Sequence, residues 1–327
     1  MFLAVGASLL HYIDFPADIM SASMRNILIG LTLVALSLPA FANKSDNGFL
    51  GRWDFDVSSA SGVGANWLSV AEKGPNDYEI WFQPTGGHVY QVKDYKLEGN
   101  HLVLHFSADN SWDLTAVGGH LTGTETHDAK TKELNGVRAP ELNHKPPKAW
   151  TDPAALFNGQ NLDGWEPIGD PANSHWIVKD GILLNEKHGD NLKTKRTFED
   201  FKLHFEVNCP EGANSGFYLR GRYEVQLEYE AENEPPERAM GSVYGRLAPS
   251  STLPKKPGQW ETFDVTLVGR TVTIARDGVT IIDGKEIAGI TGGALNADEG
   301  KPGPFYIQGD HTGGLQFRNI TVSVPKK

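Results

Sequence analysis

The residues best suited to chemistry lie on two neighbouring segments near the middle of the chain, Gly216–Arg220 and Tyr223–Glu228. Both alternate apolar and polar residues, and the two-residue period of a β-strand places the polar ones on one face. These polar residues are Tyr218, Arg220, Glu224, Gln226 and Glu228. Together they offer the hydrogen-bond donors and acceptors that sugar hydroxyls require, with an aromatic ring to cover a sugar face. The pattern predicts a sugar-binding cleft, against the simpler interpretation of a solvated sheet face.

Two carboxylates on one strand also raise the hypothesis of a conventional glycosidase, but their spacing does not fit one. At about 3.3 Å per residue, Glu224 and Glu228 lie roughly 13 Å apart. Retaining glycosidases separate their two carboxylates by about 5 Å, and inverting ones by about 6.5 to 9.5 Å. A second carboxylate would have to come from another strand, and the sequence leaves that alternative open.

The elements that must position these residues are strands. Apolar and polar residues alternate almost everywhere after residue 43, and hardly any stretch has helical spacing. Asn-Gly and Asp-Gly pairs mark tight turns, as in the hairpin Thr271–Ile282. Such strands in one large domain favour two stacked antiparallel sheets. Three Pro/Gly-rich loops that could rim a binding site interrupt them, namely Glu230–Arg238, Arg246–Gly258 and Thr291–Pro304.

A stretch rich in proline and lysine, Asn143–Lys148, divides this all-β chain. Because it cannot continue a central strand, we interpret it as a linker and place a domain boundary near residue 147. Short strands with tight polar turns precede it, and they predict a small all-β barrel or sandwich. We therefore expect a small all-β domain with its linker at 43–147 and a larger β-sandwich domain at 148–327.

The N-terminus predicts export. Met24–Asn26 precedes an apolar run, Ile27–Leu38, and Ala40–Ala42 matches the cleavage pattern of secretory signal peptides. The run is shorter than the roughly 20 apolar residues that a membrane span takes, and no later segment qualifies. We expect residues 1–42 to be absent from the mature protein, as an upstream extension and a signal peptide at 24–42. The mature protein would be periplasmic or secreted, with no membrane partner.

Composition excludes several other classes of function. The net charge of -11 makes a nucleic acid an unsuitable partner. A nucleic-acid-binding protein needs an excess of basic side chains to neutralise phosphates and release their counterions, and this chain has an excess of acidic ones. The single cysteine, Cys209, excludes an intramolecular disulfide and a thiolate-caged zinc, and we expect a buried, inert thiol. The histidines show no spacing typical of a metal site. A divalent cation, calcium or a transition metal, bound by carboxylates and carbonyls stays an open alternative without a defined ligand set, and the oligomeric state is not predicted.

A set of ordered motifs in the second half carries a family resemblance. The motifs are Leu156–Trp165, Trp176–Gly181, Asn214–Gln226, Gly269–Val272, Ile307–His311 and Phe317–Ile320. Together they resemble the 3-keto-disaccharide hydrolase family over residues from about 150 to 325. The resemblance implies a concanavalin A-like jelly-roll sandwich and an enzyme that cleaves 3-keto-glycosides. The first domain lies outside it.

The chemistry that the resemblance implies needs only one carboxylate. A ketone at C3 acidifies the hydrogen at C2, so a base can remove it and the glycosidic oxygen at C1 can leave by β-elimination, after which water adds. We assign Glu224 as the general base and Arg220, or a bound metal, as the group that stabilises the enolate oxygen. Asp310 or His311 would handle the leaving group or the water.

Further residues are expected to bind the sugar. Tyr218 and Gln308 would orient hydroxyl groups, and Trp176 and Tyr244 would supply stacking surfaces. The predicted binding set is Tyr218, Gln226, Gln308, Trp176, Tyr244 and Asn214. Simpler interpretations exist: the Gln308–Gly314 segment is also typical of a hairpin turn, and a tryptophan more often packs in a core. The alternative function is a non-catalytic, lectin-like protein, and a further hypothesis makes the first domain a separate sugar-binding module.

Overall fold

Antiparallel strands make up the regular structure of this chain, which a computed structural model describes over residues 47–57, 64–229 and 233–327. In these ranges helical structure is confined to two 3-10 turns, Pro171–Asn173 and Pro236–Arg238. The predicted all-β fold is confirmed. The expected export segment at 1–42 lies outside the described residues. Within them, no helix has the length and apolar character that a bilayer crossing demands.

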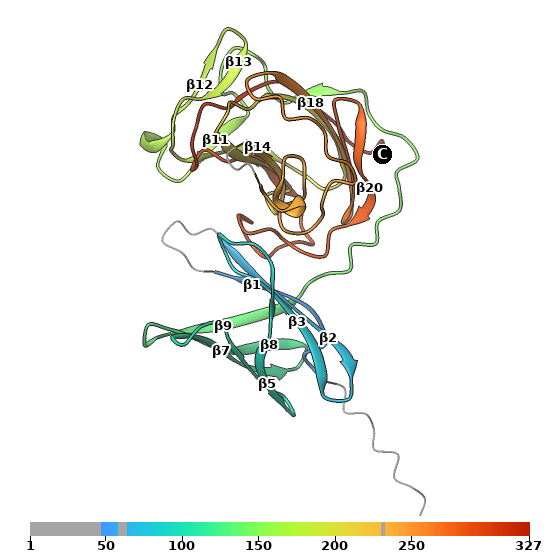
Figure 1. Cartoon of the computed structure of the whole chain (residues 1–327). Helices are drawn as coiled ribbons and strands as arrows, with labels where there is room; N and C mark the ends of the chain where they lie inside the picture. Colours follow the sequence, from blue (N-terminus) through green and yellow to red (C-terminus); the bar gives the residue numbers. More distant parts are fainter. Residues whose placement is uncertain (1–46, 58–63, 230–232) are drawn as a thin grey trace, which may run out of the picture. The chain divides into compact units, whose positions relative to one another are not determined.

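The first sheet has nine strands in the order β4-β3-β2-β1-β9-β8-β7-β6-β5. Figure 1 labels β1, β2, β3, β5, β7, β8 and β9 of this sheet. Its strands are β1 (Gly51–Asp56), β2 (Ala65–Gly74), β3 (Asp77–Gln83), β4 (Tyr90–Val92), β5 (Asp94–Glu98), β6 (His101–His105), β7 (Asn110–Val117), β8 (His120–His127) and β9 (Lys130–Arg138). The two end strands, β4 and β5, follow each other in the chain with only Lys93 between them. The sheet must therefore curl toward a barrel, and it encloses a core that includes Trp53, Phe82 and Trp112.

The second half forms two sheets. The larger has the order β12-β13-β22-β15-β18-β19-β20, with β10 paired to β22, and the smaller has the order β11-β14-β21-β16-β17. The larger sheet contains β10 (Ala154–Ala155), β12 (Trp176–Lys179), β13 (Ile182–Asn185), β15 (Phe201–Asn208), β18 (Trp260–Val268), β19 (Thr271–Arg276), β20 (Val279–Glu286) and β22 (Gln316–Ser323). The smaller contains β11 (Trp165–Ile168), β14 (Asn191–Phe198), β16 (Asn214–Leu219), β17 (Tyr223–Glu228) and β21 (Gly303–Ile307).

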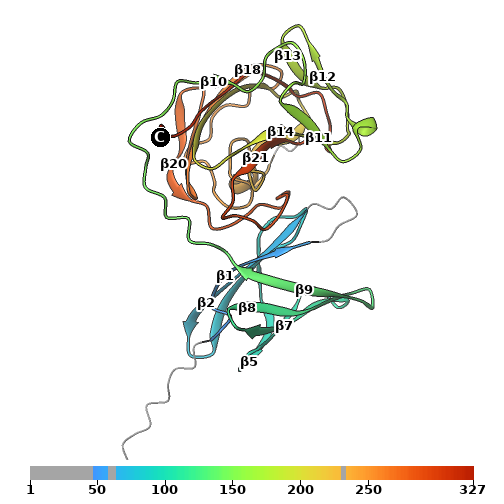
Figure 2. The ribbon, with the colours of Figure 1, turned by 180° about the vertical axis from the view of Figure 1, so that it is seen from behind.

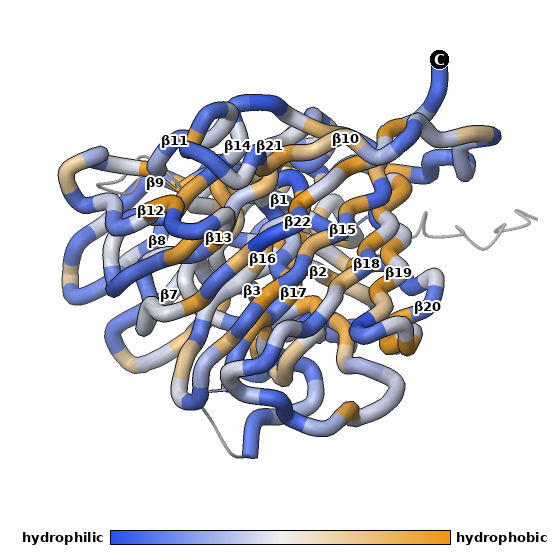
Figure 3. The backbone as a smooth tube through the Cα atoms, turned by 90° about the horizontal axis from the view of Figure 1, so that it is seen from above, coloured by the Kyte–Doolittle hydropathy of each residue, from blue (hydrophilic) through white to orange (hydrophobic). Residues whose placement is uncertain are grey.

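Aromatic rings join the two sheets into a sandwich. The ring of Phe217 on β16 stacks on that of Phe205 on β15, with 4.4 Å between ring centroids, and Phe205 also stacks on Phe263 of β18 at 5.1 Å. Along the strands, hydrophobic positions are interspersed with hydrophilic ones (Figure 3). This alternation is what buries one face of each sheet and leaves the other for polar side chains.

Between β9 and β10 the chain runs through a segment without strands, visible in green in Figures 1 and 2. It contains the stretch predicted to be a linker, Asn143–Lys148. His144 in this segment lies beside Asp200, with 2.8 Å between its Nδ1 and a carboxylate oxygen, so the linker is attached to the sandwich at that point. The predicted hairpin around Asp277-Gly278 is present as β19 and β20, and Cys209 is buried as expected.

Candidate functional site

The hairpin β16–β17 brings the predicted polar face together. Tyr218 lies directly opposite Glu224 in the register, and Gly216 lies opposite Gln226. Cross-strand partners share one face of a sheet, so the phenol and the carboxylate meet. The alternate residues of both strands belong to the sandwich core. The sequence pattern therefore predicted the orientation of both strands.

A pocket opens on this polar face, and we refer to it as the central pocket. Eight of the ten predicted site residues line it: Asn214, Tyr218, Glu224, Gln226, Tyr244, Gln308, Asp310 and His311. The rest of the lining consists of four glycines, Gly86, Gly87, Gly292 and Gly293. Side chains from β16, β17 and the segment after β21 thus converge on one space, together with backbone from two loops.

Glu224 is the most unusual of these residues, because it is an acidic side chain that is only 4% exposed. The Tyr218 hydroxyl donates a hydrogen bond to its Oε2 at 2.6 Å. The amide of Gln226, with its nitrogen toward Glu224, donates to Oε1 at 3.1 Å. Burial raises the pKa of Glu224 to about 7, and the Tyr218 hydrogen bond and the nearby His311 offset only part of that effect. A carboxyl group with this pKa is suited to take up a proton near neutral pH.

The surroundings of Glu224 hold its partners in place. The ring of Tyr218 stacks on that of Tyr306, with 4.0 Å between centroids, and the Gln308 amide donates to the Tyr218 hydroxyl at 3.2 Å. Gly216 makes room for the carboxylate, because a Cβ at this position would lie 2.2 Å from the Oε1 of Glu224. The Glu224 carboxylate is thus fixed by packing and hydrogen bonds rather than left on a mobile side chain.

Asp310 and His311 form a second group in the central pocket. The His311 Nδ1 lies 2.9 Å from Oδ1 of Asp310, and the Asn191 amide donates to Oδ2 at 3.2 Å. Asn191 also accepts a hydrogen bond from the backbone of Gly309 at 2.7 Å, which fixes the turn. Partial burial raises the pKa of Asp310, but the hydrogen bond and charge of His311, together with hydrogen bonds from Asn191 and the backbone, outweigh it, so the net shift is downward. The pKa values of Glu224 and Asp310 are therefore pushed in opposite directions.

Arg220, the predicted stabiliser of the enolate oxygen, does not line the central pocket. The strand pattern placed it beside Tyr218, but the chain already turns at Arg220 and Gly221, whose φ angles are +51° and +69°. The side chain is 1% exposed, and its guanidinium donates to the Tyr223 hydroxyl at 2.9 Å. The expectation that Arg220 contacts the sugar therefore does not fit the geometry.

Trp176, the predicted stacking platform, also lies outside the central pocket. Its indole packs in the sandwich core near Phe317, and its Nε1 donates to the Asp190 carbonyl at 3.0 Å. This is the core-packing alternative that the sequence left open. Tyr244 does line the central pocket, so an aromatic surface is available there.

The sequence did not reveal the glycines of the central pocket. Gly292 and Gly293 fall in the Thr291–Pro304 loop, which was expected only in general terms to rim a site, and Gly86 and Gly87 come from the first sheet. The Gly-Gly pairs themselves were the available signal. A pair of glycines lets backbone approach a ligand or another segment closely.

Glu224, Asp310 and His311 all line the central pocket, but within the described residues their carboxylate and imidazole ligand atoms do not all lie within 4.8 Å of one another. The group of three that does meet this condition in the described ranges is Asp109, His127 and Asp128, exposed on hairpins of the first sheet. Exposed acidic groups are common without an ion, so we assign it no role. Carboxylate, amide and imidazole donors from Glu224, Gln308, Asp310 and His311 do face one space, so a calcium or transition-metal ion there stays a prediction.

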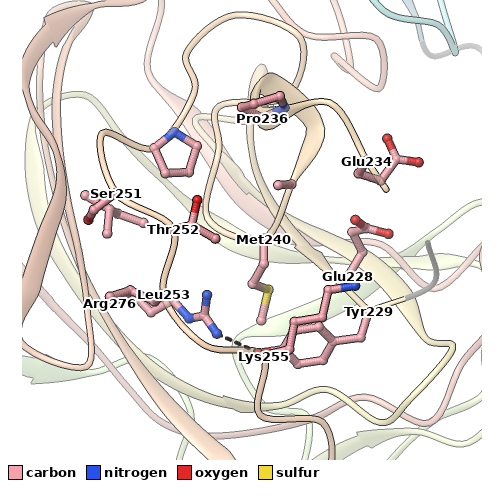
Figure 4. A pocket seen from close by; sticks show the side chains of 13 residues that line it. Glu228, Tyr229, Glu234, Pro236, Met240, Ser251, Thr252, Leu253, Lys255 and Arg276 are labelled. Carbon is pink, nitrogen blue, oxygen red and sulfur yellow. Dashed lines mark hydrogen bonds between the residues drawn. The ribbon is translucent and has the colours of Figure 1, made fainter. Parts of the chain in front are cut away.

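A second, more apolar pocket lies at one edge of the sandwich, and we refer to it as the edge pocket. Figure 4 shows Met240 and Leu253 among its lining residues, with Glu228 and Arg276 on either side. Behind it, Arg276 donates to Oε1 of Glu261 at 2.7 Å, and Tyr229 donates to Oε2 of the same carboxylate at 2.6 Å. The charges of Arg276 and Glu261 neutralise each other, which is typical of an ion pair that stabilises a fold. We therefore assign this network a structural role and place the chemistry in the central pocket.

Fold and site together define a β-sandwich protein with a buried carboxylate in a polar, glycine-lined pocket, a class suited to carbohydrates. The chain belongs to the family of the 3-keto-alpha-glucoside-1,2-lyase-like domain, whose model matches residues 152–323. The resemblance drawn from the sequence motifs is thereby confirmed. Membership of this family supports a carbohydrate-active function.

Comparison with solved structures gives low overall similarity. A candidate glycosyl hydrolase from Parabacteroides distasonis is 26% identical, with a TM-score of 0.45, over 56% of this chain and 93% of that one. A second from the same organism is 20% identical, with a TM-score of 0.43, over 54% and 94%. The carbohydrate-binding module CBM66 from Bacillus subtilis is 12% identical, with a TM-score of 0.30, over 49% and 94%. No curated protein matches the chain.

Proposed function

We propose that this protein cleaves 3-keto-glucosides, by removal of the C2 proton, β-elimination of the group at C1 and addition of water. The observation that carries the proposal is Glu224: one buried carboxyl group with a pKa raised to about 7, at the centre of a polar pocket. An eliminative mechanism needs one base of this kind. Membership of the family supports the choice of sugar class, and the lining of the central pocket supports the residue roles.

The first step is proton transfer to Glu224. The carboxylate takes the proton from C2, and the electron pair of that bond forms the enolate with the C3 oxygen. The enolate then re-forms the C3 ketone, a double bond forms between C1 and C2, and the bond from C1 to the glycosidic oxygen breaks. The Gln308 amide and the Tyr244 hydroxyl are the neutral donors of the central pocket that we assign to the sugar oxygens.

The second step concerns the leaving group and water. We assign His311 to give a proton to the departing oxygen, because Asp310 lies 2.9 Å from its Nδ1 and orients its ring toward the central pocket. Water then adds across C1 and C2: its hydroxyl bonds to C1, its other proton passes to His311, and Glu224 gives its proton back to C2. If a divalent cation binds in the central pocket, it would polarise the C3 ketone and stabilise the enolate oxygen. That role was expected of Arg220, whose side chain does not line the central pocket.

A specific observation also favours a second candidate function. Glu224 and Asp310 line the same pocket with pKa values shifted up and down respectively, which is the division between acid and base in a conventional glycosidase. In that case Glu224 would protonate the glycosidic oxygen and the sugar would need no ketone.

The experiment compares 4-nitrophenyl 3-keto-alpha-glucoside with unoxidised 4-nitrophenyl alpha-glucoside on the purified chain without residues 1–42. We expect nitrophenol release from the oxidised substrate alone, with an unsaturated keto-sugar as the intermediate and 3-keto-glucose as the product. Release from both substrates would instead establish the two-carboxylate mechanism, and sugar binding without release would establish the lectin-like alternative. Loss of release after chelation, with recovery on adding calcium or a transition metal, would assign a cation to the ketone.

We also propose export of the protein. The intact mass of the exported form tests this proposal, because removal of residues 1–42 would lower it.

A further inference from the structure

A turn of the first sheet closes one side of the central pocket. This turn, Pro84–Val89, connects β3 to β4, and its Gly86 and Gly87 line the central pocket together with Glu224. The first sheet and the sandwich belong to one unit of the chain, Asp46–Lys327. The part of the chain outside the family match therefore supplies part of the site.

Direct contacts attach the turn to the sandwich. The backbone N–H of Gly86 donates to the Gly292 carbonyl at 2.8 Å. A Cβ on Gly292 would lie 2.1 Å from the Gly87 carbonyl oxygen, and one on Gly293 would lie 2.2 Å from the Tyr218 hydroxyl. Only glycines fit between the turn and the tyrosine that hydrogen-bonds to Glu224. The distance from the turn to the catalytic hydrogen bond is thus fixed by backbone.

The turn is also held from within its own sheet. The backbone N–H of Thr85 donates to the Asn66 side chain at 2.7 Å, and its hydroxyl donates to the Ala65 carbonyl at 2.9 Å. The buried Gln83 amide donates to the Pro84 carbonyl at 2.8 Å. Such bonds fix the conformation of a loop before any ligand arrives, which is what a specificity element requires.

Below the turn, the first sheet packs into the sandwich core. Trp67 of β2 belongs to that core, and the guanidinium of Arg246 lies over its ring at 4.0 Å from the centroid. Arg246 also donates to the Ile290 carbonyl at 2.7 Å. A tethered binding module would share no core with the domain that it accompanies.

We propose that the first sheet is part of the substrate site, with Pro84–Val89 as a rigid wall that limits the size of the glycoside beside Glu224. The ligand that it meets is a pyranose ring, which the bare backbone of two glycines can approach closely. The identity of that glycoside as a 3-keto-glucoside rests on the proposed function. The wall replaces the hypothesis of a separate binding module.

Two matched glycines test the wall. Gly86 has a φ of +77° and Gly99 a φ of +61°, and a Cβ on either would meet no atom within 4 Å. Asparagine tolerates positive φ better than most residues, so Gly86→Asn and Gly99→Asn carry similar backbone strain. Only the first adds a side chain beside the central pocket, because Gly99 lies in the turn between β5 and β6. Gly86→Ala adds a smaller group at the same place.

With 4-nitrophenyl 3-keto-alpha-glucoside, we expect Gly86→Asn to raise KM about tenfold, since a misfitting group of this size costs that much in a pocket. The kcat at saturation should stay within about twofold, because Glu224 is untouched. Gly86→Ala should raise KM less, and Gly99→Asn should leave it unchanged. Equal KM values for the Gly86→Asn and Gly99→Asn proteins would overturn the wall, as would a fall in kcat alone.

Failure of the proposed function is a separate result. If the wild type cleaves neither substrate, calorimetric titration with 4-nitrophenyl alpha-glucoside takes the place of kinetics. Weaker binding by Gly86→Asn than by Gly99→Asn would then support the wall although the enzyme assignment had failed. Equal binding by both variants, or no binding by the wild type, would overturn it.

Discussion

At the scale of single residues, surroundings distinguish Glu224 from the other acidic side chains. Glu228 lies on the same face of β17, four residues along, but it lines the edge pocket. We predict that Glu224→Gln lowers kcat on the keto-sugar by about 10² to 10⁴, the usual contribution of a general base. Glu228→Gln, the matched control, should stay within about threefold of wild type. Comparable losses in both variants, measured by nitrophenol release, would remove Glu224 from the mechanism.

The pH dependence of the reaction should report the same carboxyl group. A base works only when ionised, so kcat/KM should rise with pH through about 7, where burial places the pKa of Glu224. The Tyr218 hydrogen bond lowers that pKa, and its removal in Tyr218→Phe should move the rise to higher pH by about one unit. Tyr229→Phe breaks a similar bond to Glu261 outside the central pocket and should leave the profile in place. An unchanged profile for Tyr218→Phe would contradict the assignment.

The period of two in the sequence predicted which residues of this hairpin face the central pocket, because side-chain direction in a strand is a local property. It failed at Arg220, where the strand had already become a turn of positive φ. It also could not predict that Gln308 and Asp310, more than 80 residues further along the chain, line the same pocket as Glu224. That arrangement depends on how β21 pairs with β16, and that register is set by the whole sandwich.

At the scale of elements, β16 contributes two residues to the surroundings of Glu224: Tyr218, which hydrogen-bonds to it, and Gly216, whose lack of a side chain leaves room for it. A Cβ on Gly216 would lie 2.2 Å from the Oε1 of Glu224 and 2.9 Å from the Oε1 of Gln308. The Cβ would also lie 2.8 Å from Cγ of Glu224. All of these are side-chain atoms and none is backbone, so Gly216→Ala should fold with the Glu224 carboxylate displaced from its place beside Tyr218. We predict a fall in kcat of about 10- to 100-fold, because a shift of about 1 Å can cost that much.

Gly74→Ala controls for the loss of a strand glycine, because a Cβ there meets no atom within 4 Å. The kcat of Gly74→Ala should equal that of the wild type. The melting temperatures of Gly74→Ala and Gly216→Ala should both stay close to the melting temperature of the wild type. A Gly216→Ala protein with normal kcat would show that the close approach of Glu224 is not needed for proton transfer.

Element by element, turn signals and alternation anticipated the β19–β20 hairpin and the strand-free stretch around Asn143–Lys148. The pairing of β10 with β22, and the insertion of β14 between β11 and β21, could not be derived in this way. Strands distant in sequence pair because both bury an apolar face, and many pairings satisfy that condition equally. The topology therefore depends on the complete set of packed aromatic residues.

At the scale of the whole molecule, the first sheet and the sandwich meet around buried charge. Asp54 of β1 is fully buried, and Ala297 of the sandwich donates its backbone N–H to the neighbouring Asp56 at 2.7 Å. Glu299 is also buried, and Arg270 donates to it at 2.8 Å. The sequence pattern gave no sign of this cluster, because Asp54 lies more than 200 residues before Arg270 and Glu299 in the chain.

Burial, and then the negative charge of Glu299, raise the pKa of Asp54 well above its ordinary value. The folded protein therefore holds a proton on Asp54 that the unfolded chain releases above about pH 4. Stability should fall as pH rises from there toward the raised pKa, by up to about 1.4 kcal/mol per pH unit for one proton. Asp54→Asn holds no such proton, so its free energy of unfolding in urea should depend less on pH and exceed that of the wild type at pH 8. Asp94→Asn, at an exposed position of β5, is the control, and its stability should depend on pH as that of the wild type does. If all three proteins show the same pH dependence, Asp54 is ionised in the folded protein and the prediction is wrong.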